Sequence, residues 1–502
     1  MTANAAKMPL SIGEENAGTP QKSNSENPRR HEKVSRMGTA SIPGLITEFA
    51  IPAILGMLVN GAYNVIDSIF LGQALGEIGL SAATVAMPIM AVYMALSLLL
   101  GGGGNALAAL RLGEGRLADT EVSLGNTVFL SIAFSVVIAF CALNPAILDW
   151  LLTVSSATDD VRPYAQTFIQ IISFGFIFQC VGMGVNNFIR TAGAPNRALL
   201  TMVIGAVSCT ILNYLFVIVM GMGVMGSALA TVLGQALSCV TVLWYFIVTK
   251  NTPFKLRLRC LKPQPKVIIL ILSLGMASFV VQAGMAVVNF TINHLLVQYG
   301  AVSPIGADNA LASIGVVQRV AMFTVLPLIG MSIAIQPLLG FNYGAHLVDR
   351  VRKTLWYGIG GATIIGVVMW VLIHLFPEAI VSVFGITQPG LVDFTVFALK
   401  VQLFMLPFIG FQIVGSNYFQ ATGQPTKSIL LSLTRQILFL VPLLFLLPQV
   451  LPIAFPQFNS LDALYFAAPI SDFMAIFTTA IAIVFEMRRL KKLERGEVQS
   501  KF

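Results

Sequence analysis

The chain has 502 residues, of which 56% are hydrophobic and only 10% are charged, and its formal net charge is +8. Soluble domains carry roughly 25% charged residues, and no water-soluble fold could bury so much apolar surface. This balance excludes a soluble globular enzyme and indicates an integral membrane protein.

Apolar runs recur along the chain, and several exceed the roughly 20 residues that a helix needs to cross a hydrocarbon core. Backbone groups in hydrocarbon must be paired within their own segment or in a closed barrel, whose strands would alternate in polarity, so continuous runs favour helices. We therefore predict an all-α membrane protein. Its twelve transmembrane helices are expected at residues 44–72, 80–110, 122–152, 163–190, 196–220, 224–249, 267–298, 305–340, 351–376, 393–422, 426–447 and 462–487.

Polar segments divide these helices into two sets of six. Residues 1–40 are rich in Asn, Ser, Glu, Lys and Arg, and are expected to form a disordered cytoplasmic tail. The basic segment 250–266 is expected to be a cytoplasmic linker. It would join an N-terminal six-helix lobe, residues 41–249, to a C-terminal lobe, residues 267–490, and residues 491–502 would form a second cytoplasmic tail.

The basic residues agree with this helix count, since cytoplasmic loops of membrane proteins hold an excess of Lys and Arg. If both termini are cytoplasmic, all of the 30 basic residues lie on that side except Arg162 in an external loop and Arg319, Lys400 and Arg435 within helices. The net charge thus reflects a multi-pass topology in the plasma membrane and attraction to anionic lipid, and gives no indication of nucleic-acid binding.

The two halves also resemble each other in sequence. Residues 187–195 (NFIRTAGAP) recur as residues 417–425 (NYFQATGQP), each time at the end of the fourth helix of a half. A looser echo pairs Gly79 and Gly113 with Gly306 and Gly340. Six spans per half give both copies the same orientation, so we expect two pseudo-symmetric lobes related by an axis along the membrane normal, with a solute site between them.

Four segments carry a family resemblance: residues 63–72 (YNVIDSIFLG), 190–195 (RTAGAP), 211–213 (ILN) and 226–231 (GSALAT). In their order and spacing, over roughly residues 40–490, the chain resembles the multidrug and toxic compound extrusion (MATE) family of cation-coupled antiporters. The resemblance implies two six-helix bundles, a cavity that opens alternately to each side, and export of amphipathic, often cationic compounds driven by inward H⁺ or Na⁺. We expect a monomer with no cofactor besides the coupling ion.

Asp67 is the main candidate for ion coupling, because an ionisable group inside a membrane helix costs several kcal/mol unless it is paired or solvated. Asn60, Asn64 and Asp67 lie at i, i+4 and i+7 and so share one helix face. From their distances to the helix ends, Asn213 and Thr231 are expected at the same depth as Asp67.

A carboxylate among amide and hydroxyl oxygens can hold a hard cation or take up a proton. Gln235, one turn from Thr231 on the same face, could join this cluster. Simpler roles stay open: Asp67 as an interfacial acid, Asn213 as a bond between helices, and Thr231 bonded to its own helix carbonyl.

The resemblance adds roles to some of these residues. One branch of the family has its cation site in the first lobe, with an aspartate in the first helix that Asp67 matches, and Thr231 also fits its pattern. That branch commonly has a second aspartate where this chain has Asn213, and an asparagine where it has Cys209. These departures favour protonation of a lone carboxylate over a bound metal ion, with Na⁺ at Asp67 as the alternative.

Charges within the second half form another candidate network. Isolated charges in hydrocarbon are costly, so we expect Asp472 to pair with Arg319 or with Arg435. Such a pair would be either a structural ion pair or a second coupling element, and the sequence does not choose the partner. The five cysteines show no CxxC pair and indicate neither a disulfide framework nor a metal site.

Three functional classes compete. An ion-coupled exporter is favoured by the duplication and by Asp67. A flippase for a lipid-linked or lipid-like substrate would need a basic cavity, for which Arg319, Lys400 and Arg435 are the available cations. A membrane enzyme or channel is the third class, but the four histidines lack any HExxH or paired-ligand spacing, and a two-lobed duplication suits alternating access better.

Overall fold

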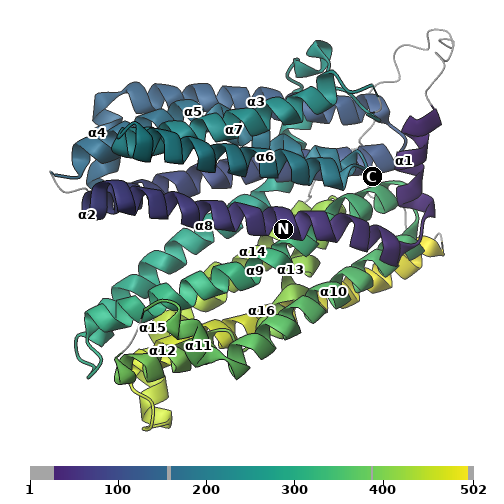
Figure 1. The fold of residues 1–502 in the computed structure, drawn as a ribbon. Helices are drawn as coiled ribbons and strands as arrows, with labels where there is room; N and C mark the ends of the chain where they lie inside the picture. The colour runs from purple at the N-terminus through teal and green to yellow at the C-terminus, as the bar shows by residue number, and fades with distance from the viewer. Residues whose placement is uncertain (1–27, 155–159, 251, 386–387, 496–502) are drawn as a thin grey trace, which may run out of the picture.

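The structure, a computed structural model, describes residues 28–154, 160–250, 252–385 and 388–495 (Figure 1). Every regular element in these ranges is a helix. The first half contains α1 (Pro28–Thr39), α2 (Ile42–Gly113), α3 (Leu117–Leu143), α4 (Pro145–Val154), α5 (Arg162–Thr191), α6 (Pro195–Asn213), the π-helix η1 (Tyr214–Val219) and α7 (Gly223–Ile247).

The second half follows the short 3₁₀ turn η2 (Leu258–Leu261). It contains α8 (Pro265–Gly300), α9 (Ala307–Gly344), α10 (Val348–Leu375), α11 (Pro377–Ser382), α12 (Pro389–Gln402), α13 (Leu406–Ala421), α14 (Pro425–Leu433), the π-helix η3 (Thr434–Leu440), α15 (Val441–Ala454) and α16 (Ser460–Glu494).

Eleven helical segments of the described chain are long and apolar enough to cross a membrane. The number becomes twelve if α12 and α13, which meet at a bend of 42°, form one span. Each of the twelve predicted helices corresponds to one of these segments, with ends that differ by up to nine residues. The predicted all-α membrane fold is therefore confirmed.

α2 contains two of these spans, Ile42–Asp67 and Val85–Gly113. As a straight helix, its 72 residues would extend about 108 Å at 1.5 Å per residue. Yet Gly38, just before α2, and Gly113, at its end, both pack against Phe341. The chain must therefore reverse direction within α2, and its two spans lie antiparallel as the two predicted helices require.

The repeat has the same backbone structure in both halves. α5 and α13 end in turns whose glycines, Gly193 and Gly423, have φ of 76° and 73°, a left-handed conformation that glycine adopts without a steric penalty. The turns carry matching hydrogen bonds, from Gly193 N to Arg190 O and from Gly423 N to Gln420 O. A proline then begins the next helix in each half, and in each half that helix continues as a π-helix, η1 or η3.

The looser glycine echo needs a correction. α2 ends at Gly113 and α9 ends at Gly344, and these two glycines interlock. A Cβ on Gly113 would lie 2.1 Å from the Phe341 carbonyl oxygen, and one on Gly344 would lie 2.1 Å from the Leu110 carbonyl oxygen. The counterpart of Gly113 is therefore Gly344 and not Gly340, because only a residue without a side chain permits this approach between the halves.

The prediction of a disordered tail over residues 1–40 is also wrong in part. Residues 28–39 form α1, which the side chain of Arg350 holds by donating to Met37 O and Ala40 O at 3.1 and 2.7 Å. Met37 is only 1% exposed. Residues 1–27 of the predicted tail and residues 496–502 lie outside the described part of the chain.

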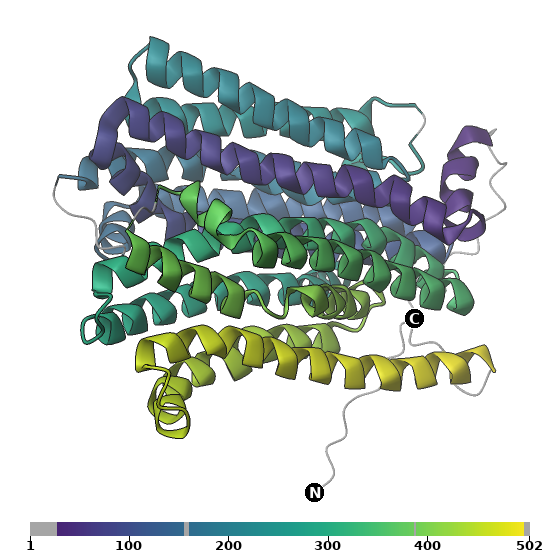
Figure 2. The same cartoon turned by 60° about the horizontal axis from the view of Figure 1, so that its bottom comes forward.

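The helices form two groups that follow the chain order. α2 to α7 lie together on one side, and α8 to α16 lie on the other (Figures 1 and 2). The two groups approach each other near α1 and diverge toward the opposite end (Figure 1). The linker packs on the first group, since Arg257 forms an ion pair with Glu121 at 3.0 Å and Asn126 accepts a hydrogen bond from Gln264 N at 2.8 Å.

Candidate functional site

Asp67 points from α2 toward two other helices of the first half. Its Oδ1 accepts hydrogen bonds from Asn213 Nδ2 at the end of α6 and from Ser227 Oγ in α7, both at 2.9 Å. Asp67 lies some 25 residues along its helix from the end near α1, so this cluster is at the far end of the bundle. The acid thus faces the interior of the lobe.

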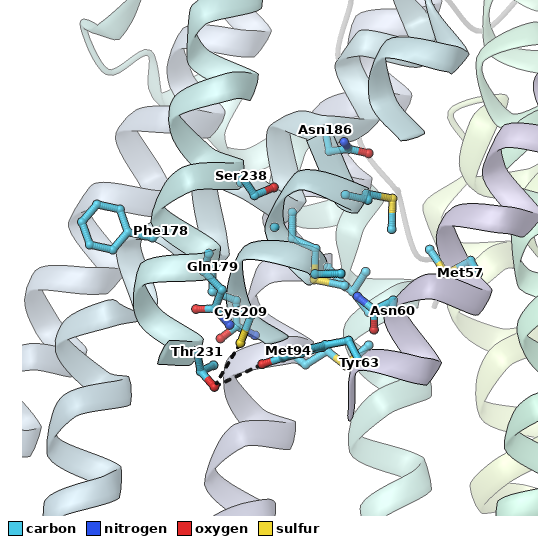
Figure 3. Close-up of a pocket in the computed structure, with 18 of the residues that line it drawn as sticks. Met57, Asn60, Tyr63, Met94, Phe178, Gln179, Asn186, Cys209, Thr231 and Ser238 are labelled. Carbon is cyan, nitrogen blue, oxygen red and sulfur yellow. Dashed lines mark hydrogen bonds between the residues drawn. The ribbon is translucent and has the colours of Figure 1, made fainter. Parts of the chain in front are cut away.

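A chain of polar contacts continues from Asp67 toward the middle of the lobe. Asn213 Nδ2 also lies 3.5 Å from Cys209 Sγ, and Cys209 Sγ lies 3.9 Å from Thr231 Oγ1. Tyr63 donates its hydroxyl to Thr231 Oγ1 at 3.2 Å (Figure 3). Thr231 is therefore near Asp67 through Tyr63 and Cys209, and not by a direct bond.

Tyr63 and Ser227 were not among the residues predicted for the site. Each has a signal in the sequence, because Tyr63 is four residues before Asp67 and Ser227 is four residues before Thr231. Side chains at i and i+4 share a helix face. Both also belong to segments that carry the family resemblance.

A cavity of about 280 Å³ begins at this polar chain and extends between α2, α5, α6 and α7. Tyr63, Cys209 and Thr231 line one end of it, and Asn186 lies at the other (Figure 3). Five methionines contribute to its wall: Met57, Met90, Met94, Met183 and Met202. Flexible, polarisable thioethers suit a surface that accepts varied apolar shapes.

The remaining predicted residues of the first half have different outcomes. Asn60 and Gln235 line the cavity, so the structure places them beside this space. Among the described side chains, Asn213 and Ser227 donate to the Asp67 carboxylate. Asn64 lies on α2, but its side chain is outside the described part of the structure.

A cation on the cavity wall was not predicted. Arg190, in the repeated turn, lines the end of the cavity opposite Thr231 and is only 1% exposed. Its Nη1 donates to Asn186 Oδ1 at 2.9 Å and to Asn187 Oδ1 at 2.6 Å, and its Nη2 lies 3.5 Å from Met202 Sδ. In the sequence this arginine is part of a turn motif, and the motif does not indicate that its side chain lines a cavity.

In the second half, Arg435 is the partner of Asp472. Arg435 Nε lies 2.8 Å from Asp472 Oδ1, and the two side chains are 21% and 8% exposed. Arg319 is exposed on α9 and forms no ion pair within the described chain. The predicted network of three charges is therefore an ion pair between η3 and α16, without Arg319.

An all-helical membrane protein with duplicated halves and a cavity inside a helical bundle has the architecture of a secondary transporter. The family model described as MatE matches residues 52–215 and 277–446 of this chain. The chain therefore belongs to the MATE family, a family of transporters and not of enzymes.

Curated relatives extend over most of the chain. The multidrug export protein MepA of Staphylococcus haemolyticus is 23% identical over 469 residues, which cover 93% of this chain and 99% of the relative. The probable multidrug resistance protein YpnP of Bacillus subtilis is 27% identical over 387 residues, which cover 77% of this chain and 84% of the relative.

Solved structures share the fold. A multidrug resistance MATE transporter of the MOP superfamily in an outward-facing conformation superposes with a TM-score of 0.83 at 23% identity, over 92% of this chain and 99% of that one. The MATE multidrug transporter DinF-BH has a TM-score of 0.80 at 32% identity, over 90% and 97% of the two chains.

Proposed function

We propose that this protein is a secondary active antiporter that exports amphipathic or cationic drug-like compounds across the plasma membrane in exchange for H⁺, by alternating access. The names of its relatives, which describe multidrug export and multidrug resistance, support the substrate class. The observation that carries the proposal is the contact of the partly buried Asp67 with Asn213 and Ser227, just beyond one end of a cavity inside the same lobe.

Contacts between the halves near α1 support alternating access. Asn105 Nδ2 of α2 donates to Gln336 Oε1 of α9 at 3.0 Å, and both side chains are buried. Gly103 of α2 packs so closely on α8 that a Cβ would lie 1.9 Å from the Ile271 carbonyl oxygen. These contacts close the end near α1, whereas the two groups of helices diverge at the other end (Figure 1).

The donor set around Asp67 favours H⁺ over Na⁺. Ser227 donates its hydroxyl to Asp67, and Asn213 presents its Nδ2 and not its Oδ1. A hard cation needs oxygen ligands that turn toward it, whereas N–H and O–H groups stabilise an ionised carboxylate directly. In this orientation of Asn213 the described groups present donors to Asp67, which supports the proton as the coupling ion that we propose.

Asn213 offers a way to accept the protonated state. Its Oδ1 is buried without a hydrogen-bond partner. Rotation of the amide by half a turn would present this oxygen to Asp67, and a carboxyl O–H could then donate to it. Protonation would turn the bond from Asn213 into one that Asp67 donates, and the bond from Ser227 would lose its charge assistance. This loosens the contact between α2 and α7 and couples the proton to helix movement.

The flippase alternative needs a basic cavity, and the three cations predicted for such a cavity do not form one. Arg435 is paired with Asp472, and neither Arg319 nor Lys400 lines the cavity. We propose a monomer in the lipid bilayer with both termini cytoplasmic, as the distribution of basic residues indicates.

Uptake into liposomes that contain the purified protein tests the proposed function. A fluorescent amphipathic cation is offered under an imposed pH gradient without Na⁺, and separately under a Na⁺ gradient at uniform pH. We expect uptake under the pH gradient alone. Strict dependence on Na⁺ would overturn the proposed coupling ion, and absence of uptake under both gradients would overturn the exporter.

A further inference from the structure

We propose that the cavity of the first half contains an anion subsite at Arg190, so that the transporter also takes amphiphiles that carry a carboxylate or a phosphate group. The inference rests on the proposed function, because it names a substrate class for the same cavity. It differs from the expectation of cationic compounds, and it follows from the charge and the hydrogen bonds of one buried side chain.

Arg190 is a buried cation without a carboxylate. A guanidinium has five N–H donors. In this structure two of them meet amide oxygens, of Asn186 and Asn187, and one meets the sulfur of Met202, which is a weak acceptor. Its Nε is buried with no partner, and none of the ion pairs among the described residues involves Arg190. A buried charge normally requires a partner, and here the protein does not supply one.

The described residues of the cavity wall supply no other charge to offset this one. Arg190 is the only ionised side chain among the lining residues, since Asp67 stands behind Tyr63 and Thr231 and does not line the space. The polar groups nearest the far end, Thr231 and Cys209, are neutral. The space as a whole therefore favours a negatively charged group, placed at its Arg190 end.

The repeat shows that the turn itself does not need this charge. Gln420 is the counterpart of Arg190 in the second half, and the turn that it begins has the same left-handed glycine and the same hydrogen bonds. Gln420 is neutral and bonds to Ser278 Oγ at 3.1 Å. Capping the end of α5 thus explains the backbone of Arg190 but not its guanidinium.

The surroundings define the rest of the ligand. The planar fork of a guanidinium matches the two oxygens of a carboxylate or phosphate. The Nε has no partner, and the Nη2 lies beside the thioether of Met202, a weak acceptor that an anion would easily displace. Both nitrogens are therefore available to an anionic group. Methionines line the wall between Arg190 and Thr231, so the body attached to the anion should be apolar. At about 280 Å³ the cavity accommodates a small drug-sized body.

A pair of dyes with the same body isolates the charge. A rhodamine with a free carboxylate and its ethyl ester differ in that group, and the binding of each to the purified full-length protein can be measured by fluorescence anisotropy. We expect the wild type to bind the free acid more tightly than the ester. Equal binding, or tighter binding of the ester, would overturn the proposal without any variant.

The test variant is Arg190→Gln, which copies the second half of the protein. We expect it to weaken the free acid roughly tenfold to a hundredfold, the usual loss for a charge-assisted hydrogen bond, and to leave the ester within about twofold. Arg319→Gln is the matched control, because it removes an exposed cation of α9 that does not line the cavity. Equal losses for both dyes in Arg190→Gln, or loss of the free acid in Arg319→Gln alone, would contradict the subsite.

Two further arms separate the outcomes. The first arm adds short-chain phosphatidylglycerol to protein that has bound the free acid. Displacement from the wild type, but not from residual sites in Arg190→Gln, would indicate a lipid phosphate as the anion. No displacement would indicate a drug-like carboxylate. Uptake of the ester under a pH gradient tests the proposed function separately, because it needs coupling but not Arg190. Ester uptake with no preference for the acid would overturn the anion subsite alone.

Discussion

Single residues in the Asp67 cluster each have a distinct task. Asn213 and Ser227 bond directly to the carboxylate, whereas Tyr63 and Thr231 separate that carboxylate from the cavity that we propose to hold the substrate. A proton and a substrate can therefore occupy neighbouring spaces in one lobe without direct contact. Coupling then requires that protonation changes the packing of α2 against α6 and α7.

Ser227→Ala tests the direct donor. Without its hydroxyl the ionised form of Asp67 loses one of the two bonds that described residues donate to it, so protonation becomes easier and the pH midpoint of transport should move upward by roughly one unit. The measurement is the rate of dye uptake as a function of internal and external pH.

Ser238→Ala is the control for Ser227→Ala. Ser238 also lines the cavity, but its hydroxyl donates to Thr201 O and not to Asp67. Its midpoint should match the wild type. A midpoint that stays in place in Ser227→Ala, or moves equally in both variants, would separate Ser227 from the coupling step.

Asp472→Asn tests whether the pair with Arg435 is structural. Removing one partner of a buried pair costs about 3–5 kcal/mol, because the other charge stays buried, so thermal unfolding should begin several degrees lower. The double variant Asp472→Asn with Arg435→Gln should recover most of the loss. Normal stability with lost transport in the single variant would instead assign this pair to the coupling mechanism.

The sequence predicted the Asp67 cluster only in part, for a physical reason. Helix periodicity and depth bring Asp67, Asn213 and Thr231 to roughly one level, but they do not give the position of one helix along and about its axis relative to another. Ser227 and Thr231 share a face of α7 one turn apart, so the axial position of α7 against α2 decides that Ser227, and not Thr231, bonds to Asp67. Helix packing likewise decides that Arg435, and not Arg319, meets Asp472.

Helical elements were predicted more closely than contacts. Apolar length determines a span, so every predicted helix has its counterpart. Local breaks were less visible: Pro145 separates α3 from α4 within the predicted helix 122–152, and the bend between α12 and α13 lies within the predicted helix 393–422. Hydropathy does not register such breaks, because the residues on both sides are equally apolar.

The linker between the halves offers a test of topology at the element scale. Cys260 lies in η2, outside the spans, and its carbonyl accepts from Asn126 Nδ2. Burial, and then the nearby Glu121 carboxylate, raise the pKa of the Cys260 thiol above its usual value. Because the thiolate is the nucleophile, labelling should be slow near neutral pH and should accelerate as the pH rises toward and beyond that value.

A variant that keeps Cys260 as its only cysteine makes this labelling specific. In intact cells a membrane-permeant maleimide should label it and an impermeant one should not. Labelling by the impermeant reagent would place the linker outside and reverse the proposed orientation. Glu121→Gln should speed the reaction at fixed pH, since it removes a negative charge that disfavours the thiolate.

Helix ends near α1 are where the halves meet. Gly344→Ala would force a Cβ against the Leu110 carbonyl oxygen, an overpacking that typically costs about 1–3 kcal/mol. We expect a lower temperature of thermal unfolding and slower gradient-driven uptake. Gly360→Ala in α10 is the matched control, because a Cβ there meets no atom within 4 Å. Equal behaviour of the two variants would argue against this interlock.

At the scale of the whole molecule, two helical groups meet near α1 and diverge at the other end (Figure 1). Asp67 lies toward the diverging end, which we propose to be external, so that a proton could enter from outside while the cytoplasmic end is closed. The duplication made the two-lobed arrangement predictable from the sequence. The cavity inside the first lobe was not predicted, because the sequence indicated a solute site only between the lobes.

The most direct test of the account compares wild type and Asp67→Asn in liposomes without Na⁺. The measurement is accumulation of a fluorescent amphipathic cation driven by a pH gradient alone, with dye binding recorded on the same preparations. The account predicts accumulation by the wild type and none by Asp67→Asn, while both bind the dye. Undiminished accumulation by Asp67→Asn would contradict the claim that this carboxylate carries the coupling proton.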